Sequence, residues 1–222
     1  CTSYCSINIG SNKYAGGIVG TDKGYSTLAN CVNRGSISGA DCIGGIMGTS
    51  NMSSSFSNCI NYGTINCSTQ KAAGICGNAT DGCQFENCEN HGNVTATGIS
   101  VGGIIGITGT VKNLPVTNCI NSGNIIGSQH VGGIGGQIIG TATIENCLNL
   151  GSITSSTSNA GGISGLAKSG VIISNCFNAG KITATSSRGG ILGSVTSSEK
   201  ISSCINIGVS NTAIASAGTI SN

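Results

Sequence analysis

The sequence has few charged and few aromatic residues, at 7% and 3% of the chain, and it contains one proline and no tryptophan. Average globular chains carry about 25% charged residues, so Ser, Thr, Asn and Gly must cover most of this surface. Disorder is excluded, because disordered chains combine low hydrophobicity with high net charge. This chain is 38% hydrophobic and has a net charge of +2.

The small net charge gives no electrostatic reason to expect binding to nucleic acid or to an anionic membrane. No apolar run approaches the ~20 residues that a membrane-spanning helix needs, so we expect no membrane insertion. The numbering begins inside a repeated pattern. We therefore expect residues 1–222 to form one repeat domain, which is a segment of a longer array or a subunit of a filament.

The sequence is built from a repeat with two alternating lines. The first line is an apolar residue, two spacers, Cys, a spacer, Asn, a spacer and Gly, as in FSNCINYG at 56–63, and the second is typified by VGGIIG at 101–106. Seven Cys residues about 29 positions apart mark the first line, and each is followed two positions later by Asn. These ladder residues are Cys31, Cys59, Cys88, Cys119, Cys147, Cys176 and Cys204, with Asn33, Asn61, Asn90, Asn121, Asn149, Asn178 and Asn206.

Each repeat predicts three short strands separated by Gly, Asn or Ser. None of them shows the 3.6-residue apolar period of an amphipathic helix. A single such unit cannot bury its apolar face, but units stacked on their neighbours build a continuous core. We therefore predict an all-β fold, namely a three-sided parallel β-solenoid (β-helix) of about eight coils of ~29 residues.

Three apolar columns, which begin at Ile18, Leu28 and Ile37, are expected to point inward on the three sides. Strict alternation would turn Cys147 outward, so we expect a bend at Asn146 that returns Cys147 to the core. The stacked Asn side chains are expected to bond the amides above and below them and to satisfy turn backbone. The Gly pair of the second line is expected to allow a tight corner or a positive φ.

The alternation of the two lines resembles the GLUG-motif repeat family, which is named for a Gly-hydrophobic-x-Gly signature. That signature runs from GIVG at 17–20 to GILG at 190–193, and the resemblance covers nearly the whole chain, from about Cys5 to Gly208. The resemblance implies a repeat array in a large secreted or surface-attached microbial protein, such as an adhesin. It implies a scaffold or adhesive role and no catalytic residues.

The thirteen Cys residues do not follow zinc-site spacing, because the close pairs lack a partner pair. We therefore expect no metal and no cofactor, and we interpret the ladder Cys as small buried apolar groups. Among the Cys outside the ladder, Cys76 and Cys83 form the best candidate disulfide. The odd total leaves at least one thiol free.

Catalysis on a solenoid requires clustered carboxylates or a basic residue on one face. The chain has seven acidic residues, and the densest group is Asp81, Glu86, Glu89 and His91. A group of this kind is typical of a solvated face. We therefore expect no catalytic residues and no enzymatic activity.

Two alternative functions follow from surface rows. Thr95-Ala96-Thr97 and Thr183-Ala184-Thr185 fit the Thr/Ser rows of an ice-binding solenoid, and Thr154-Ser155-Ser156 fits in part. Residues 38–40, 66–68 and 126–128 break the row. A carbohydrate-binding module would need exposed aromatic residues, and four tyrosines are candidates. They are Tyr4, Tyr14, Tyr25 and Tyr62.

The preferred hypothesis is an extracellular or cell-surface scaffold, a stalk or a filament component. Its expected partners are its own copies or neighbouring repeats, joined end to end, and a host or surface glycan or protein. Four N-glycosylation sequons become relevant only in a eukaryotic secretory pathway. They lie at Asn51, Asn66, Asn78 and Asn93.

Overall fold

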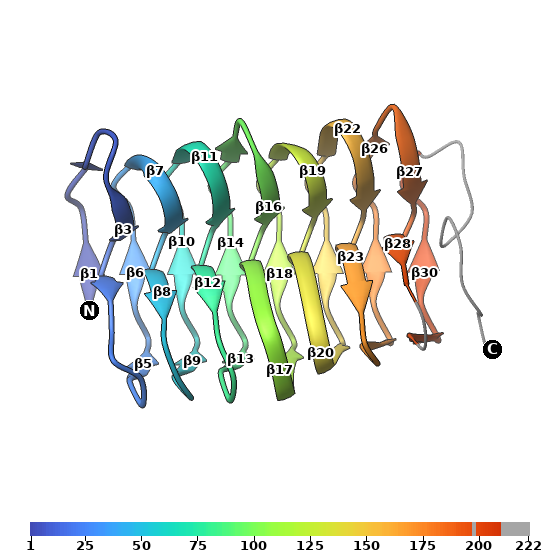
Figure 1. Cartoon of the computed structure of the whole chain (residues 1–222), viewed down its shortest axis with the longest axis horizontal. Helices are drawn as coiled ribbons and strands as arrows, with labels where there is room; N and C mark the ends of the chain where they lie inside the picture. The colour runs from blue at the N-terminus through green and yellow to red at the C-terminus, as the bar shows by residue number, and fades with distance from the viewer. Residues whose placement is uncertain (197–198, 210–222) are drawn as a thin grey trace.

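The computed structural model describes residues 1–196 and 199–209. Over those residues the chain forms thirty strands and no helix, and therefore no helix that could cross a membrane. The strands wind into coils that stack side by side along one axis, from the N-terminal coil at the left of Figure 1 to β30 near its right end. The predicted three-sided parallel β-solenoid is confirmed, with about seven turns of ~29 residues where about eight coils were expected. The predicted domain extends to residue 222, and residues 210–222 lie outside the described ranges.

The first sheet contains one two-residue strand from each coil, and it carries the Asn of the first sequence line. Its eight strands pair in parallel, with Asn always opposite Asn from β6 onward. In spatial order they are β1 (Thr2–Ser3), β6 (Val32–Asn33), β10 (Ile60–Asn61), β14 (Glu89–Asn90), β18 (Ile120–Asn121), β21 (Leu148–Asn149), β25 (Phe177–Asn178) and β30 (Ile205–Asn206).

The second sheet has ten strands, and it ends at the Gly pair of the second sequence line. Some coils contribute one long strand and others contribute two short ones. The strands are β2 (Ile7–Asn8), β3 (Lys13–Gly16), β7 (Ile37–Gly44), β11 (Ile65–Ala73), β15 (Val94–Ala96), β16 (Ile99–Gly102), β19 (Ile125–Gly132), β22 (Ile153–Gly161), β26 (Ile182–Thr183) and β27 (Ser186–Gly189).

The third sheet has twelve strands and leads from the Gly pair back to the Cys of the next repeat. Its first members are β4 (Val19–Thr21), β5 (Thr27–Ala29), β8 (Met47–Ser50), β9 (Ser55–Ser57), β12 (Cys76–Ala79) and β13 (Gln84–Glu86). The remaining members are β17 (Ile105–Thr117), β20 (Gly135–Glu145), β23 (Ser164–Lys168), β24 (Ile172–Ser174), β28 (Leu192–Val195) and β29 (Lys200–Ser202).

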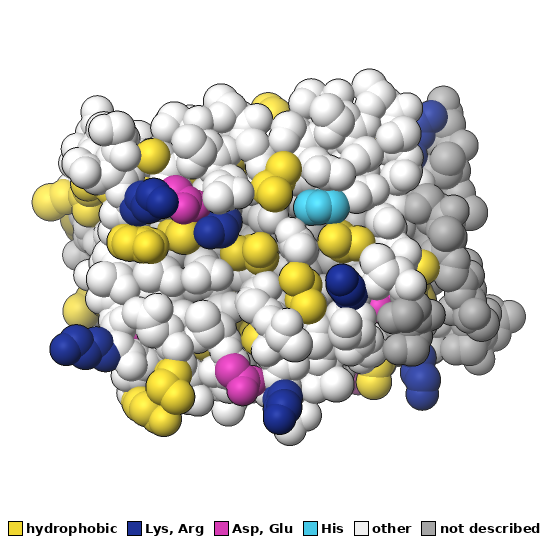
Figure 2. Space-filling view, in the orientation of Figure 1, with side chains coloured by type: hydrophobic (Ala, Val, Ile, Leu, Met, Phe, Trp, Pro, Cys, Tyr) yellow, Lys and Arg dark blue, Asp and Glu magenta, His cyan; other side chains and the backbone are white. Residues whose placement is uncertain are grey.

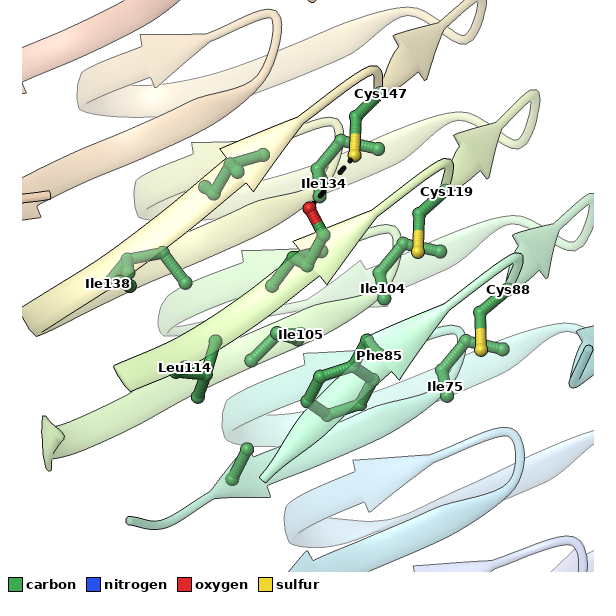
Figure 3. Packing of buried hydrophobic residues seen from close by; sticks show 14 of the residues in the cluster. Ile75, Phe85, Cys88, Ile104, Ile105, Leu114, Cys119, Ile134, Ile138 and Cys147 are labelled. Atoms are coloured by element: carbon green, nitrogen blue, oxygen red, sulfur yellow. Dashed lines mark hydrogen bonds between the residues drawn. The ribbon is translucent and has the colours of Figure 1, made fainter. Parts of the chain in front are cut away.

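The core consists of like residues stacked on like along the axis. The column that contains Phe56 and Phe85 is buried, and those two rings stack with centroids 4.6 Å apart. Figure 3 shows Cys88, Cys119 and Cys147 one above another, each beside the Ile of its own coil. The expected stacking of successive windows is therefore present, and each coil buries its apolar face against its neighbours.

The bend expected at Asn146 is observed. Asn146 has a φ of 55°, Cys147 is 1% exposed and Leu148 is partly exposed. The Sγ of Cys147 donates weakly to the carbonyl oxygens of Glu145, at 3.3 Å, and Val116, at 3.6 Å. A residue in the same left-handed conformation precedes every ladder Cys. We name this column the asparagine corner, and its members are Asn30, Asn58, Asn87, Asn118, Asn146, Asn175 and Ser203.

The second Asn of each repeat forms a continuous buried ladder of amides. From Asn33 to Asn178, each side chain donates one N–H to the Oδ1 of the next Asn at 2.7–2.8 Å and another to the backbone oxygen of its own Gly two residues later. The second Gly of each Gly pair packs on this ladder, because a Cβ on Gly133 would lie 2.4 Å from Cγ of Asn149. The two sequence lines are therefore in contact across the thin interior.

The Gly pair does not adopt the positive φ that was considered for it. Among the residues that the structure describes, the glycines with positive φ are Gly10, Gly24, Gly82, Gly140 and Gly170, all outside the pairs. The pair provides space, since a Cβ on Gly44 would lie 2.0 Å from the carbonyl oxygen of Met47, although Ala73 takes the equivalent first position in β11. Real Cβ atoms do not approach a backbone atom that closely.

Candidate functional site

A second column of left-handed residues lies two positions before each Gly pair, at the end of the second sheet. Their φ angles range from 44° to 70°, and their residue types differ from coil to coil. We name this column the variable corner. Its members are Tyr14, Cys42, Lys71, Ser100, His130, Asn159 and Ser187.

This backbone conformation is unfavourable for most of these residues. A left-handed φ costs L-residues roughly 1–2 kcal/mol, and only Gly and to a lesser degree Asn or Asp adopt it routinely. Residues strained in this way persist where the surrounding structure fixes them, and such residues cluster at functional sites. Here the second Gly of each pair packs against the amide ladder directly behind the corner in every described coil.

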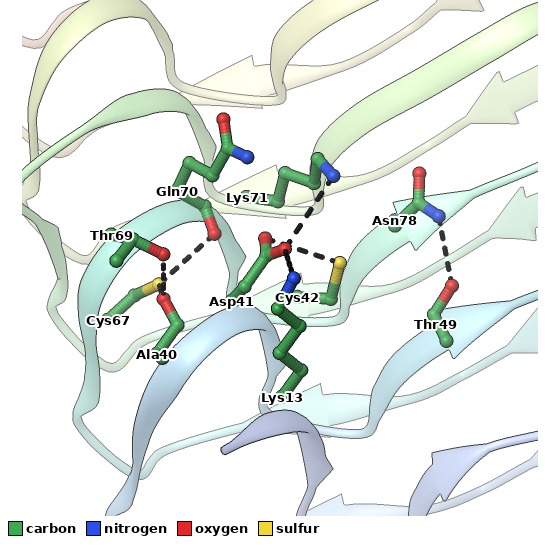
Figure 4. Close-up of polar contacts among 10 residues, drawn as sticks. All are labelled: Lys13, Ala40, Asp41, Cys42, Thr49, Cys67, Thr69, Gln70, Lys71 and Asn78. Atoms are coloured by element: carbon green, nitrogen blue, oxygen red, sulfur yellow. Dashed lines mark hydrogen bonds and ion pairs between the residues drawn. The ribbon is translucent and has the colours of Figure 1, made fainter. Parts of the chain in front are cut away.

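The N-terminal part of the variable corner holds a buried carboxylate between two lysines from neighbouring coils. Asp41 on β7 is 5% exposed. Its Oδ2 lies 3.7 Å from Nζ of Lys13 on β3 and 3.8 Å from Nζ of Lys71 on β11 (Figure 4). A register shift between Cys67 and Gln70 in β11 places Gln70 opposite Asp41 and Lys71 beside it. Asp41 thus ties three coils together and leaves one positive charge in excess.

Cys42 is the one thiol at this corner, and it is held as a neutral donor. Its Sγ lies 3.4 Å from Oδ1 of Asp41. Burial, with the negative charge of Asp41 as the second cause, raises the pKa of Cys42 to about 12. Since the thiolate is the reactive form of Cys, Cys42 is protonated at neutral pH and is not a nucleophile.

Further along the axis the corner carries uncharged polar contacts between coils. Ser100 donates to Oε1 of Gln137 at 2.9 Å, and Gln129 donates to Ser158 at 3.1 Å. The amide of Asn159 lies 2.9 Å from Nδ1 of His130, and burial lowers the pKa of His130. Figure 2 shows this face, on which a few charged groups stand among many uncharged ones.

The outer face of the first sheet carries a row in which Ser, His and Glu are hydrogen-bonded. Oγ of Ser122 lies 2.7 Å from Nδ1 of His91, and Nε2 of His91 lies 2.8 Å from Oε2 of Glu89. Nucleophilic catalysis by such a row also needs donors for an oxyanion. The nearby N–H groups of Ser122 and Gly123 both bond the carbonyl of Asn90, so neither is free for that role. The row therefore gives no support to a catalytic assignment.

The four tyrosines do not form one patch. Tyr14 lies on the second sheet, Tyr25 follows β4 of the third, and Tyr4 and Tyr62 lie next to strands of the first. The ring of Tyr62 stacks on His91 with centroids 5.0 Å apart, and the guanidinium of Arg34 lies 4.4 Å from its centroid. Stacking on a sugar needs an open ring face, and in Tyr62 neighbouring coils occupy both faces.

The Thr/Ser row lies on the outer face of the second sheet. Thr154 and Thr183 are paired neighbours, and Thr95 is paired with Ile126, which is 43% exposed. At its N-terminal end the row borders a shallow trough of about 420 Å³, which Asn66 helps to line. The expected interruption at residues 126–128 is therefore an exposed apolar side chain.

The cysteines are free thiols, and the proposed pair Cys76 and Cys83 is no exception. The predicted Cys76–Cys83 disulfide is not formed in this structure, in which both side chains are buried. Burial raises the pKa of Cys76 well above its ordinary value, and the Sγ of Cys83 faces Oγ of Ser50 at 3.4 Å. Within residues 1–196 and 199–209, no group of three or more His, Cys, Asp or Glu side chains is arranged to hold a metal ion.

The four sequons differ in their environment. Asn51 and Asn66 are exposed, and Asn51 donates to the hydroxyl of Thr21. Asn78 is half-buried and donates to the hydroxyl of Thr49, whereas Oδ1 of Asn93 accepts from the backbone of Asn124. Glycosylation at any of them stays a prediction.

Sequence reasoning did not identify the variable corner. Its residue types share nothing, so no motif marks it. The corner could have been found from its constant place in the repeat, two positions before each Gly pair, because the residue type changes there while the neighbouring positions recur.

Comparison with models of known protein families, with curated proteins and with solved structures finds no match for this chain. The resemblance to the GLUG-motif family therefore stays a prediction that rests on the repeated residues.

Proposed function

We propose that this chain is an extracellular or cell-surface repeat scaffold without catalysis, which holds a row of recognition side chains along a rod. The rod supplies spacing and stiffness through its backbone ladders, stacked core and amide ladder. The members of the variable corner that are not buried supply the contacts to a partner, together with Lys13 and Gln129 beside them. On this proposal the protein acts as a stalk, surface or filament component with adhesive properties.

The observation that carries the proposal is the contrast between fixed and variable positions. In repeat proteins the framework positions recur, while binding residues vary on one face of the stack. Six of the seven corner residues are neither Gly nor Asn, although the backbone there favours those types. The identities of the exposed and half-buried members are explained if they serve a partner in addition to the contacts between coils.

The partner of such a row is a surface glycan or a protein. Lys13 and Lys71 beside Asp41 suit a carboxylate or another weakly acidic group. The amide and hydroxyl groups of Gln129, Asn159 and their neighbours suit uncharged polar groups. End-to-end association of rods, or association with neighbouring repeats, is proposed as the route to a longer array.

The test is adhesion under flow. Beads coated with the protein are passed over glass that carries mucin, collagen or no coating, and bead retention is measured. A corner variant with Lys13→Ser, Lys71→Ser, Gln129→Ser and His130→Ser is expected to lose at least threefold in retention on one coating. A control variant with Ser38→Ala, Thr95→Ala and Thr154→Ala changes the Thr/Ser row of the second sheet, away from the corner, and should retain beads normally. Equal retention by all three proteins would contradict the proposal.

Ice binding is the alternative that a different face supports, since Thr154 and Thr183 are adjacent on a flat sheet. Ile126 and the half-buried Ser38 interrupt that row. A thermal-hysteresis measurement separates the two hypotheses, because an adhesive scaffold leaves the freezing point of a dilute solution unchanged.

A further inference from the structure

A groove of about 460 Å³ crosses four coils on the third sheet, at the edge where β13, β17, β20 and β24 lie side by side. It lies where the coils differ most in length. The pairing of β17 with β20 shifts register between Lys112 and Leu114, and Gly140 and Gly170 turn the next two coils with positive φ. Grooves of 300–1,000 Å³ are the usual size of small-ligand sites.

The floor of the groove is aliphatic. Leu114 and Ala142 are buried beneath it, and Pro115 and Ile172 line it from neighbouring strands. Ile172 is 38% exposed, and in its outward column it lies between Thr143 and Lys200, with Pro115 on the far side of Thr143. A ligand that covers this floor removes apolar surface from water, which contributes about 25 cal/mol of binding free energy per Å².

The rim of the groove carries amides and hydroxyls. Gln84 and Asn113 are exposed, and their side-chain amides make no hydrogen bond within the described part of the chain. Thr143 lines the opposite strand, and the hydroxyl of Thr141 accepts from the backbone N–H of Asn113 at 3.1 Å. None of the described lining residues is charged or aromatic.

From this chemistry we propose that the groove binds an extended, uncharged peptide segment that places an aliphatic side chain on Leu114, Pro115 and Ile172. The free amides of Gln84 and Asn113 pair with the backbone N–H and C=O of the segment. A sugar is disfavoured because the lining offers no aromatic ring, and a charged ligand is disfavoured because the lining offers no counter-charge.

The inference is independent of the adhesive function. The groove uses strands of the third sheet, whereas the variable corner lies at the end of the second. Variants at one site therefore leave the other unchanged, and either proposal can fail alone.

The experiment is a titration of the ¹⁵N-labelled full chain, followed by amide chemical shifts. The probes are the blocked peptide N-acetyl-Ala-Leu-Ala-amide, its Asp counterpart and the neutral disaccharide cellobiose. The Leu peptide is expected to cause saturable shifts at Gln84, Asn113, Thr143 and Ile172, with at least tenfold weaker binding of the Asp peptide. Ile172→Lys is expected to weaken the Leu peptide at least fivefold.

The matched control is Ser55→Lys, which changes the same outward column one coil before the groove and should bind the Leu peptide normally. Lys is compatible with the fold in this column, because Lys200 occupies it beside Ile172. Saturable binding of cellobiose in place of the peptide would overturn the ligand class. Two results would overturn the site. One is the absence of saturable shifts with the Leu peptide, and the other is an equal loss of affinity for that peptide in Ile172→Lys and Ser55→Lys.

Discussion

The asparagine corner and the variable corner have the same backbone conformation but opposite residue usage. At the asparagine corner six of seven residues are Asn, and their side chains are exposed to solvent. At the variable corner one of seven is Asn, and Ser100 and His130 use their side chains to contact neighbouring coils, while Cys42 contacts Asp41 of its own coil. One corner therefore selects residues for backbone conformation, and the other selects them for side-chain contacts.

The difference shows where this solenoid tolerates conformational strain. A non-Gly, non-Asn residue with left-handed φ is retained only if something else stabilises the turn. At the variable corner that role falls to the Gly pair and the amide ladder immediately behind it, as Gly133 against Asn149 illustrates. The repeated framework thereby frees the corner positions to carry varied chemistry.

The largest effect is expected when this support is removed. In Gly133→Ala the added Cβ would lie 2.2 Å from the carbonyl oxygen of Gly162 and 2.4 Å from Cγ of Asn149. Overpacking costs about 1–3 kcal/mol, and displacement of the ladder amide adds to it, so we expect a loss of about 3 kcal/mol in urea unfolding. The control Gly109→Ala meets no atom within 4 Å and should change stability little. A Gly133→Ala protein as stable as this control would show that the pair does not hold the corner.

The second-largest effect tests whether the left-handed backbone conformation selects Asn at the asparagine corner. Asn146→Val puts a β-branched residue at a φ of 55°, which such residues strongly avoid. We expect a loss of about 2 kcal/mol in chemical denaturation, whereas Asn146→Gly should stay within about 0.5 kcal/mol of the parent. Similar stabilities for the Val and Gly proteins would mean that backbone preference does not explain the Asn column.

A smaller effect of opposite sign is expected at the variable corner. Ser187 has a φ of 44° and an exposed side chain, so Ser187→Gly relieves strain and removes little packing. Relief of roughly 1–2 kcal/mol, offset by the 0.5–1 kcal/mol entropy cost of Gly, predicts a gain of about 0.5 kcal/mol. The matched control is Asn159→Gly in the same column, which relieves less strain and also loses the contact to His130. It should not gain stability, and equal gains in both would contradict the strain argument.

The two corners also mark what the sequence could predict. The apolar columns, the bend before Cys147 and the amide ladder were predictable, because seven copies repeat the same local cause. The left-handed φ at Lys71 was not predictable, since Lys is not a turn residue and its conformation depends on packing from other coils.

The Asp41 cluster was not predictable for a related reason. The residue opposite Asp41 depends on the register shift after Cys67, and a shift of this kind has no sequence motif. The pairing of Cys76 with Cys83 was proposed from proximity in the chain, but burial and neighbouring atoms determine where each thiol points.

The smallest effect is on the pH dependence of stability. It compares two residue types within the variable corner, His at position 130 and Asn as found at position 159. Burial lowers the pKa of His130 below its value of about 6.5 in the unfolded chain, and the Asn159 amide beside Nδ1 fits the neutral ring. Because the unfolded state then binds the proton first, His130 stabilises the fold above pH 6.5 and loses that contribution as pH falls toward its folded pKa. His130→Asn, which matches the residue of the next coil, should lack this component. Urea unfolding from pH 7.5 to 5 should therefore show a steeper decline in stability for the parent than for the variant. His91 and the carboxylates are common to both proteins and cancel in the difference, so parallel pH profiles would place His130 in solvent and remove it from the set of contacts that distinguish this corner.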